Sequence, residues 1–231
     1  MTHVMLDLET WGKTPGSDIR SIGAVVFDPT APYGGFVGMR CTSCINGASD
    51  PWGCTDCLNT GTDSRGEFYV ACENSSVIEP GVFSYYPDGV GGYRKYPLAR
   101  DPETVKWWSE QTPEAQAAFE HPVDLRKACG QFQTWFCEFE NGNMQSSKTF
   151  IWANGPQFDI SILKAVFDAV GLDEPWYYRA PRDFRTITDA AGMTRDDFQA
   201  FNHGTTHNAL DDAISQAKIV CEAYKRLGLQ K

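Results

Sequence analysis

The sequence predicts a single α/β domain from its length, its apolar content and the order of its periodic segments. The chain has 231 residues, which fits one such domain with room for an insertion. Hydrophobic residues make up 42% of it and aromatic residues 13%, enough to build a substantial core. Short apolar segments typical of strands, including 3–9 and 150–153, occur with segments of helical periodicity, including 159–170 and 208–227.

Three strands are predicted in the first third of the chain. Residues 3–9 and 21–28 are largely apolar and predict two strands, and a turn containing Gly and Pro separates them. Residues 67–73 predict a third strand, which can pair with the second as a hairpin. The segment between the second and third strands is far longer than a usual hairpin loop, so residues 31–66 are predicted to be an insertion.

The remaining elements are mostly helical. Residues 77–100 are rich in Gly, Pro and Tyr and are predicted to be irregular loop. Helices are predicted to begin at Asp101 and Thr112, each followed by Pro and Glu. Residues 123–140 carry apolar residues at helical spacing. A buried strand at 150–153, a helix at 159–170 and a strongly amphipathic helix at 208–227 complete the pattern.

Two carboxylates, Asp7 and Glu9, lie one residue apart in the first strand. Because side chains alternate faces along a strand, both point the same way. Like charges on one face of a core strand are costly unless a cation lies between them. A divalent metal with hard oxygen ligands, Mg²⁺ or Mn²⁺, is the simplest such cation. The alternative is an edge strand with a polar face.

Further acids lie at the ends of other elements. Asp159 falls where a buried strand leads into a helix, and Asp212 lies at the start of the last helix, after His207. If these acids converge with Asp7 and Glu9, they can hold two metal ions for a phosphoryl displacement. His207 is a candidate general base because histidine ionises near neutral pH. The alternative for His207 is an ordinary polar residue at a helix N-terminus.

The order of these residues resembles a known nuclease superfamily. The pattern reads Asp7-x-Glu9-Thr, then Asn-Gly-x-x-Phe-Asp159, then His207-x-Ala-x-x-Asp212-Ala. It resembles the DEDD exonuclease superfamily in its His-containing DEDDh branch, which includes DnaQ-like proofreading subunits and RNase T. Each motif alone has low specificity, but their order and spacing together are specific.

A narrower resemblance rests on additional residues. The segments 21–25, 104–114 and 152–159 are similar to those of the subgroup that contains exonuclease VIII-type domains and small exoribonucleases. The resemblance spans residues 4–30 and 67–228, and it omits the cysteine-rich insertion.

The resemblance implies an RNase H-like exonuclease fold, with a mixed central sheet flanked by helices, over residues 1–231. It implies a metal-dependent 3′-5′ exonuclease that hydrolyses phosphodiester bonds of single-stranded RNA or DNA. The alternatives are a catalytically inactive nucleic-acid-binding module and a phosphodiesterase acting on very short oligonucleotides. The resemblance also allows a homodimer, since RNase T works as a dimer.

The same resemblance implies roles for individual residues. The metal-binding acids would be Asp7, Glu9, Asp159 and Asp212, holding two Mg²⁺ or Mn²⁺ ions, and the general base would be His207. The neighbouring Asp211 does not fit the motif, because the family spacing places the acid five residues after the histidine. A rival base, His203, lies outside the motif.

Aromatic and polar side chains near the motifs are candidates to hold the substrate strand. Trp11, Trp108 and Phe158 offer faces on which bases can stack. Asn154 either fixes the turn of its motif or binds the nucleotide. Trp107 is a further candidate. Adjacent helix positions point to different faces, so at least one of Trp107 and Trp108 is expected to pack in the core.

Basic residues concentrate in two stretches, 94–106 and 179–185, which either follow phosphates or form solvated faces. The net charge of −10 argues against a passive nucleic-acid coat. It does not exclude an enzyme whose acidic site is neutralised by divalent ions. The sequence shows no secretory signal and no membrane span, so we expect a cytoplasmic protein with no membrane partner.

The insertion at 31–66 carries two Cys-x-x-Cys pairs, Cys41 with Cys44 and Cys54 with Cys57. Such pairs suit one structural Zn²⁺ held by four thiolates. The alternative is unliganded or redox-active cysteines. The segment from Cys54 also faintly resembles a zinc knuckle of the DnaJ type. The other four cysteines are scattered and are expected to be reduced thiols in the core.

Overall fold

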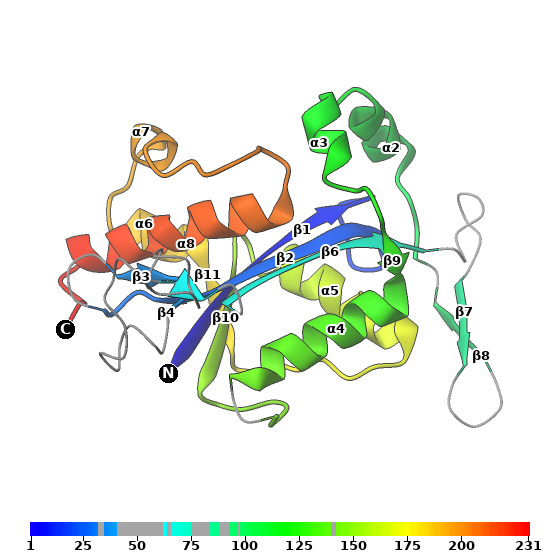
Figure 1. The fold of residues 1–231 in the computed structure, drawn as a ribbon, viewed down its shortest axis with the longest axis horizontal. Coiled ribbons are helices and arrows are strands. Elements are labelled where there is room, and N and C mark those ends of the chain that lie inside the picture. Colours follow the sequence, from blue (N-terminus) through cyan, green and yellow to red (C-terminus); the bar gives the residue numbers. More distant parts are fainter. Residues whose placement is uncertain are drawn as a thin grey trace, which may run out of the picture.

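A mixed β-sheet lies at the centre of the computed structural model (Figure 1). The structure describes residues 1–31, 35–40, 62–63, 66–74, 84–87, 93–96, 98–139 and 142–231. The strands of this sheet are β1 (Thr2–Thr10), β2 (Ile19–Asp28), β3 (Phe36–Val37), β6 (Glu67–Glu73), β9 (Val123–Asp124), β10 (Thr149–Ala153) and β11 (Pro181–Asp183). Their order is β11-β10-β1-β2-β6-β9, and β3 also pairs with β2.

The pairing of β1 orients the first two carboxylates. β1 runs antiparallel to β2 and parallel to β10, and β2 runs antiparallel to β6. The predicted pairing of the second and third strands is therefore confirmed. Val4, Leu6 and Leu8 pack into the core on one face of the sheet, and Met5 packs into a second cluster on the other face. The alternation along β1 places Asp7 on the face of Met5.

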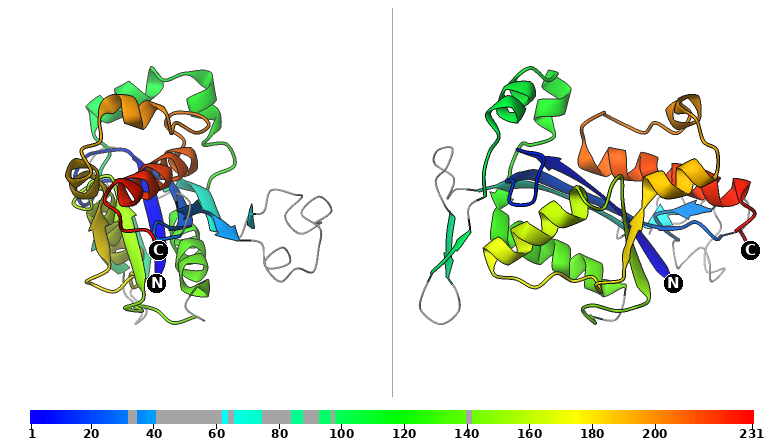
Figure 2. Two further views of the ribbon diagram at one scale, coloured as in Figure 1. Left: turned by 90° about the vertical axis from the view of Figure 1, so that its left-hand side faces the viewer. Right: turned by 180° about the vertical axis from the view of Figure 1, so that it is seen from behind.

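Helices cover both faces of the sheet (Figures 1 and 2). The helices are α2 (Pro102–Ser109), α3 (Pro113–Ala117), α4 (Leu125–Glu138), α5 (Asp159–Val170), α6 (Phe184–Ala190), α7 (Arg195–Gln199) and α8 (Ala209–Arg226). α8 packs on β1 and β2 from one side, and α4 and α5 lie on the other. α2 and α3 lie beyond the C-terminal end of β1. The expected mixed sheet flanked by helices is confirmed.

Gly23 of β2 permits α8 to approach the sheet closely. A Cβ atom at this position would overlap the backbone of Ala209 at the start of α8. Only a glycine therefore lets the first turn of α8 lie directly on β2. Because Gly23 pairs with Asp7 of β1, this contact brings the start of α8 next to the acids of β1.

Several sequence expectations need correction. The segment 77–100 was expected to be irregular, but it contains an antiparallel pair, β7 (Ser84–Pro87) and β8 (Tyr93–Tyr96). The strand β11 and the helices α6 and α7 were not expected, and the helix predicted over 123–140 is shorter, as α4. Within the insertion, β4 (Met39–Arg40) pairs with β5 (Thr62–Asp63).

Cys41, Cys44, Cys54 and Cys57 lie outside the described residues, and so does most of the predicted zinc subdomain. The four scattered cysteines, Cys72, Cys129, Cys137 and Cys221, are buried, as expected. Among the helices that the structure describes, none combines the length and the apolar character needed to cross a membrane.

Candidate active site

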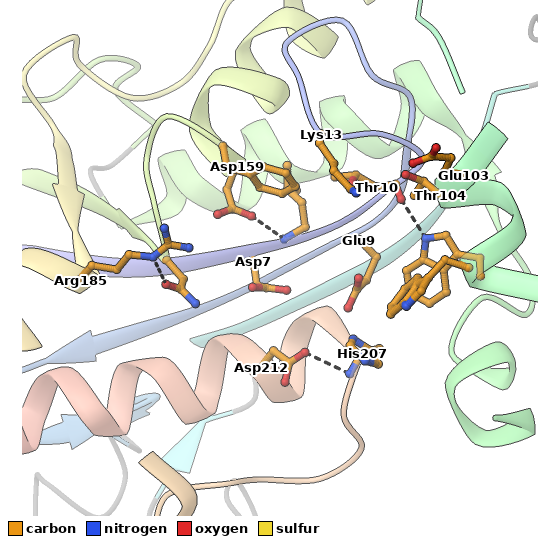
Figure 3. Close-up of a pocket in the computed structure, with 15 residues that line it drawn as sticks. Asp7, Glu9, Thr10, Lys13, Glu103, Thr104, Asp159, Arg185, His207 and Asp212 are labelled. Atoms are coloured by element: carbon orange, nitrogen blue, oxygen red, sulfur yellow. Dashed lines mark hydrogen bonds between the residues drawn. The ribbon is translucent and has the colours of Figure 1, made fainter. Parts of the chain in front are cut away.

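A cavity of about 710 Å³ lies at the C-terminal end of β1 (Figure 3). Its lining comes mainly from β1, α2, the start of α5, the start of α6 and the start of α8. The structure brings all five residues of the predicted catalytic set to this cavity, namely Asp7, Glu9, Asp159, His207 and Asp212. These residues span almost the whole sequence, so their convergence is a property of the fold.

The two acids of β1 lie at the base of the cavity, Asp7 half-buried and Glu9 buried. Glu9 is 8% exposed. Asp7 Oδ1 accepts a 2.8 Å hydrogen bond from Nε2 of Gln216, which lies on α8. Gln216 was not predicted from the sequence. Its position four residues after Asp212 places both on one helix face, and that spacing is the signal that could have identified it.

Asp159 is the first residue of α5 and is 3% exposed. Its Oδ1 accepts a 3.3 Å hydrogen bond from the backbone N–H of Leu8. This bond ties the carboxylate of α5 to the strand that carries Asp7 and Glu9. A carboxylate in the first turn of a helix also benefits from the partial positive charge of that helix end.

The start of α8 presents His207 and Asp212 together. Asn208 caps the helix, because its side chain accepts from the backbone N–H groups of Leu210 and Asp211. His207 precedes the cap with a φ of 66°. Its backbone N–H donates to Oδ2 of Asp212 at 3.1 Å. The cap therefore fixes both side chains relative to the cavity.

One side-chain atom from each of Glu9, His207 and Asp212 lies within 4.8 Å of the others. Carboxylate oxygens and an imidazole nitrogen at this separation can share one cation. Asp7, beside Glu9 on β1, and Asp159, on the side away from α8, face the same space (Figure 3).

The neighbouring residues Asp211 and His203 face elsewhere. Asp211 Oδ2 accepts from the backbone N–H of Thr205 at 2.8 Å, and Nε2 of His203 lies 3.9 Å from Oδ1 of Asp211. Neither residue lines the cavity. Asp211 therefore holds the loop before α8, whereas Asp212 faces the cavity.

The electrostatics of the site reflect crowded, buried acids. Burial and then the charges of Asp159, Glu9 and Asp212 hold the pKa of Asp7 well above its ordinary value. Burial, followed by the charge of Asp212, raises the pKa of Glu9 to about 8. Burial raises the pKa of Asp159 to about 7. Burial also raises the pKa of Asp212.

Protons or cations must balance these charges. The donors are hard carboxylate oxygens, the type that Mg²⁺ and Mn²⁺ prefer. A divalent ion would favour the charged forms of these acids and remove the cost of their burial. The residues present therefore fit divalent metal ions.

Two tryptophans of α2 have different surroundings. Trp108 is 2% exposed, and its Nε1 donates to the backbone carbonyl of Thr10 at 2.9 Å. Trp107 is 42% exposed, and its ring centroid lies 5.0 Å from that of His207. Both line the cavity, but Trp107 offers the accessible surface. Phe158 and Asn154, also predicted to hold substrate, line it as well.

Trp11 does not line the cavity, contrary to the expectation that it would face a terminal base. The guanidinium carbons of Arg20 and Arg100 lie 4.6 and 4.7 Å from its ring centroid. Trp11 therefore packs between two arginines. The register shift between Glu9 and Thr10 breaks the alternation that would have directed it to the cavity.

Basic residues from the 179–185 stretch have separate environments. Arg185 lines the cavity, and its Nε donates to Oδ1 of Asn154 at 3.0 Å. Arg182 instead lies over the Phe150 ring at 3.8 Å. Lys13, which follows the first strand, also lines the cavity and was not predicted.

The clustered acids and histidine form a site whose chemistry suits phosphodiester hydrolysis. The profile of the 3′-5′ exoribonuclease Rv2179c-like domain family matches residues 2–224, and the chain belongs to that family. That family is described as a 3′-5′ exoribonuclease domain. No match was found among curated protein sequences.

The fold is shared with a solved nuclease structure. Cell-death related nuclease 4 (CRN-4) aligns with a TM-score of 0.56 and 13% identity, over 98% of this chain and 64% of that one. The chain therefore spans less than two thirds of CRN-4. The nuclease domain of 3′hExo, a DEDDh family member bound to rAMP, aligns with a TM-score of 0.47 and 10% identity, over 97% and 92% of the two chains.

Proposed function

We propose that this protein removes nucleotides from the 3′ end of single-stranded RNA by metal-dependent hydrolysis, releasing nucleoside 5′-monophosphates. The observation that carries the proposal is the convergence of Asp7, Glu9, Asp159, His207 and Asp212 on one cavity. RNA is chosen because the matching family is described as exoribonuclease. Single-stranded DNA is the competing substrate in the test below.

The four carboxylates would hold two Mg²⁺ or Mn²⁺ ions. When bound, such ions supply charge stabilisation for the attacking and leaving oxygens of a phosphoryl displacement. The buried positions of Glu9 and Asp159 support this role, because such acids need a cation to remain charged. Gln216 would orient Asp7 toward an ion through its 2.8 Å hydrogen bond.

His207 would accept a proton from the attacking water. Its ring lies at the cavity wall beside Trp107, and its backbone is fixed by the hydrogen bond to Asp212. A fixed base near the reacting phosphate lowers the entropic cost of the proton transfer. The departing 3′ oxygen then takes up a proton from solvent.

Trp107 and Phe158 would contact the terminal nucleoside. Base stacking on aromatic rings is tolerant of sequence, as an exonuclease requires. The exposed face of Trp107 supports this role. Trp108 would shape the cavity wall through its bond to the Thr10 carbonyl.

The wider organisation also belongs to this proposal. Residues 1–231 would form one RNase H-like exonuclease domain of the exonuclease VIII-type or small exoribonuclease subgroup. Residues 31–66 would form a subdomain with one structural Zn²⁺ held by the four paired cysteines. The protein would act in the cytoplasm, and a homodimer is compatible with the proposal.

The test uses 5′-labelled single-stranded RNA, single-stranded DNA of the same sequence, and RNA dinucleotides. Each is incubated with the purified protein and Mg²⁺ or Mn²⁺, with and without a chelator. We expect stepwise shortening of the RNA from its 3′ end, and no shortening with the chelator. Binding without shortening would indicate an inactive module. Turnover of dinucleotides alone would indicate a short-oligonucleotide phosphodiesterase, and faster shortening of DNA would contradict the substrate assignment.

A further inference from the structure

A second cavity of about 460 Å³ adjoins the first. Asn154, Arg185 and Asp212 line both, so the two cavities meet at these side chains. The second cavity continues over α6 and α8, and Phe198 of α7 and Asn202 after α7 contribute to its wall. Beside the charged residues Arg185, Asp189 and Asp212, its wall carries aromatic and uncharged polar groups. These suit a nucleoside, which needs stacking surfaces and hydrogen-bond partners.

Arg185 stands where the cavities meet. Its Nε donates to Asn154 Oδ1 at 3.0 Å, and its backbone N–H donates to Asp183 Oδ1 at 3.1 Å. Within the described part of the chain, no group accepts a hydrogen bond from Nη1 or Nη2, and the side chain is exposed. Asn154 therefore orients a guanidinium whose remaining donors are available. A planar, pre-oriented guanidinium is well suited to phosphate oxygens.

Acids predominate among the charged residues that line the first cavity, so a phosphate bound there needs a cationic partner such as Arg185. Among its described lining residues, Lys13 and Arg185 are the only lysine and arginine. Arg185 lies beyond Asp7 when viewed from Glu9 and His207 (Figure 3). The proposed metal ions would serve the scissile phosphate. The next phosphate along the RNA would also lie close to the acids, with no metal ion to offset the repulsion. It would need a separate cation, and Arg185 is on that side.

We infer that the second cavity binds the nucleotide on the 5′ side of the scissile bond, and that Arg185 binds that nucleotide's own 5′ phosphate. This inference rests on the proposed function, because it places the terminal nucleotide beside Trp107 and the scissile phosphate at the acid cluster. The chain then passes Asp212 and Asn154 into the second cavity. The phosphate that Arg185 contacts is the second linkage from the 3′ end.

The test combines a substitution of Arg185 with removal of one phosphate charge from the RNA, as in a double-mutant cycle. RNA oligonucleotides of one sequence carry either no change, a neutral methylphosphonate at the second linkage from the 3′ end, or one at the fourth linkage. The rate of release of the terminal nucleotide gives kcat/KM for the wild type, Arg185→Gln and Arg185→Lys. Arg179→Gln is the matched control, because Arg179 is exposed and lines neither cavity.

For the wild type, we expect the second-linkage methylphosphonate to lower kcat/KM by roughly 10- to 100-fold. Arg185→Gln should lose a similar factor on unmodified RNA, mainly through KM, and should then be indifferent to that methylphosphonate. Arg185→Lys should recover part of the loss, and Arg179→Gln should match the wild type. A methylphosphonate at the fourth linkage should change kcat/KM by the same factor in the wild type and in Arg185→Gln.

Full sensitivity of Arg185→Gln to the second-linkage methylphosphonate would overturn the inference while leaving the exonuclease assignment intact. The inference would also be overturned if Arg185→Gln removed the effect of the fourth-linkage methylphosphonate as fully as that of the second-linkage one. Failure of the wild type to shorten even unmodified RNA would instead overturn the proposed function. Fluorescence anisotropy with the same oligonucleotides and Ca²⁺ provides a binding readout, in which the methylphosphonate should weaken binding to the wild type only.

Discussion

The backbone N–H of His207 donates a 3.1 Å hydrogen bond to Oδ2 of Asp212. The adjacent carboxylate, Asp211, accepts instead from the backbone N–H of Thr205 at 2.8 Å. Two neighbouring acids on one helix therefore point to different places. Asp212 shares the cavity with Glu9, whereas Asp211 stabilises the loop that leads to His207.

Because Asp211 and Asp212 are adjacent but face different surroundings, Asp211→Asn is a matched control for Asp212→Asn. Asp212→Asn should lower exonuclease activity by at least about 1,000-fold, because a carboxylate proposed to hold metal becomes neutral. Asp211→Asn should keep activity within about threefold and lower the melting temperature slightly, since it weakens a half-exposed loop contact. Activity with labelled RNA and circular dichroism melting measure both effects. Equal loss of activity in the two variants would contradict the assignment.

Stability of the metal-free protein should fall as the pH rises. The ordinary pKa of Glu9 is 4.5 and the folded state raises it to about 8, while that of Asp159 is raised from 3.8 to about 7. Between these values the folded protein keeps protons that the unfolded chain has released. Stabilisation by these protons is therefore complete below about pH 4 and is lost as the pH approaches 8.

Calorimetry in the presence of a chelator measures this dependence. We expect the melting temperature to fall by at least about 4 °C between pH 5 and pH 8. Asp7→Asn should raise the melting temperature at pH 8, because it removes one ionisable carboxyl group from the crowded acids. Saturating Mg²⁺ should reduce the pH dependence. A melting temperature that stays constant over this range would show that the acids are not in the crowded, buried state described.

The two tryptophans of α2 should respond differently to truncation. Trp107→Ala should leave the free energy of unfolding nearly unchanged and raise KM roughly tenfold, through loss of base stacking. Trp108→Ala should destabilise the protein by about 3–5 kcal/mol, because it removes a buried ring and its bond to Thr10. Chemical denaturation and steady-state kinetics separate the two effects. A large stability loss in Trp107→Ala would contradict its role at the surface.

The paired cysteines predict about one zinc ion per chain, as expected for a four-thiolate site. Elemental analysis of protein purified without chelator measures this ratio. Replacing Cys41 and Cys44 with serine should abolish zinc binding. Replacing the buried cysteine Cys129 with alanine provides the control and should leave the zinc content unchanged. A ratio near zero in the wild type would rule out the zinc subdomain.

Local periodicity explains how much of the site was predictable. Asp7 and Glu9 lie within a regular strand, so the two-residue repeat was enough to place them on one face. The start of α8 was recognisable because Asn208 is a strong capping residue. The distance between these segments came only from the motif resemblance, since periodicity carries no tertiary information.

The failures have physical causes as well. Trp11 follows a register shift in β1, and sequence periodicity does not reveal where a strand loses its alternation. β11 is a three-residue edge strand that forms by pairing with β10, and a segment so short has no period of its own. Arg185 was visible only as one of several arginines, because its contact with Asn154 depends on how α6 packs beside the end of β10.

The most direct test of the account is calorimetric titration of the metal-free protein with Mn²⁺ at pH 7.5, in the absence of nucleic acid but with a nucleoside 5′-monophosphate present. We predict that the wild type binds two ions in the cavity, and that Asp7→Asn and Asp159→Asn each lose at least one of them, while Asp211→Asn binds as the wild type does. Unchanged Mn²⁺ binding in Asp7→Asn and Asp159→Asn would contradict the claim that these acids converge to hold divalent cations.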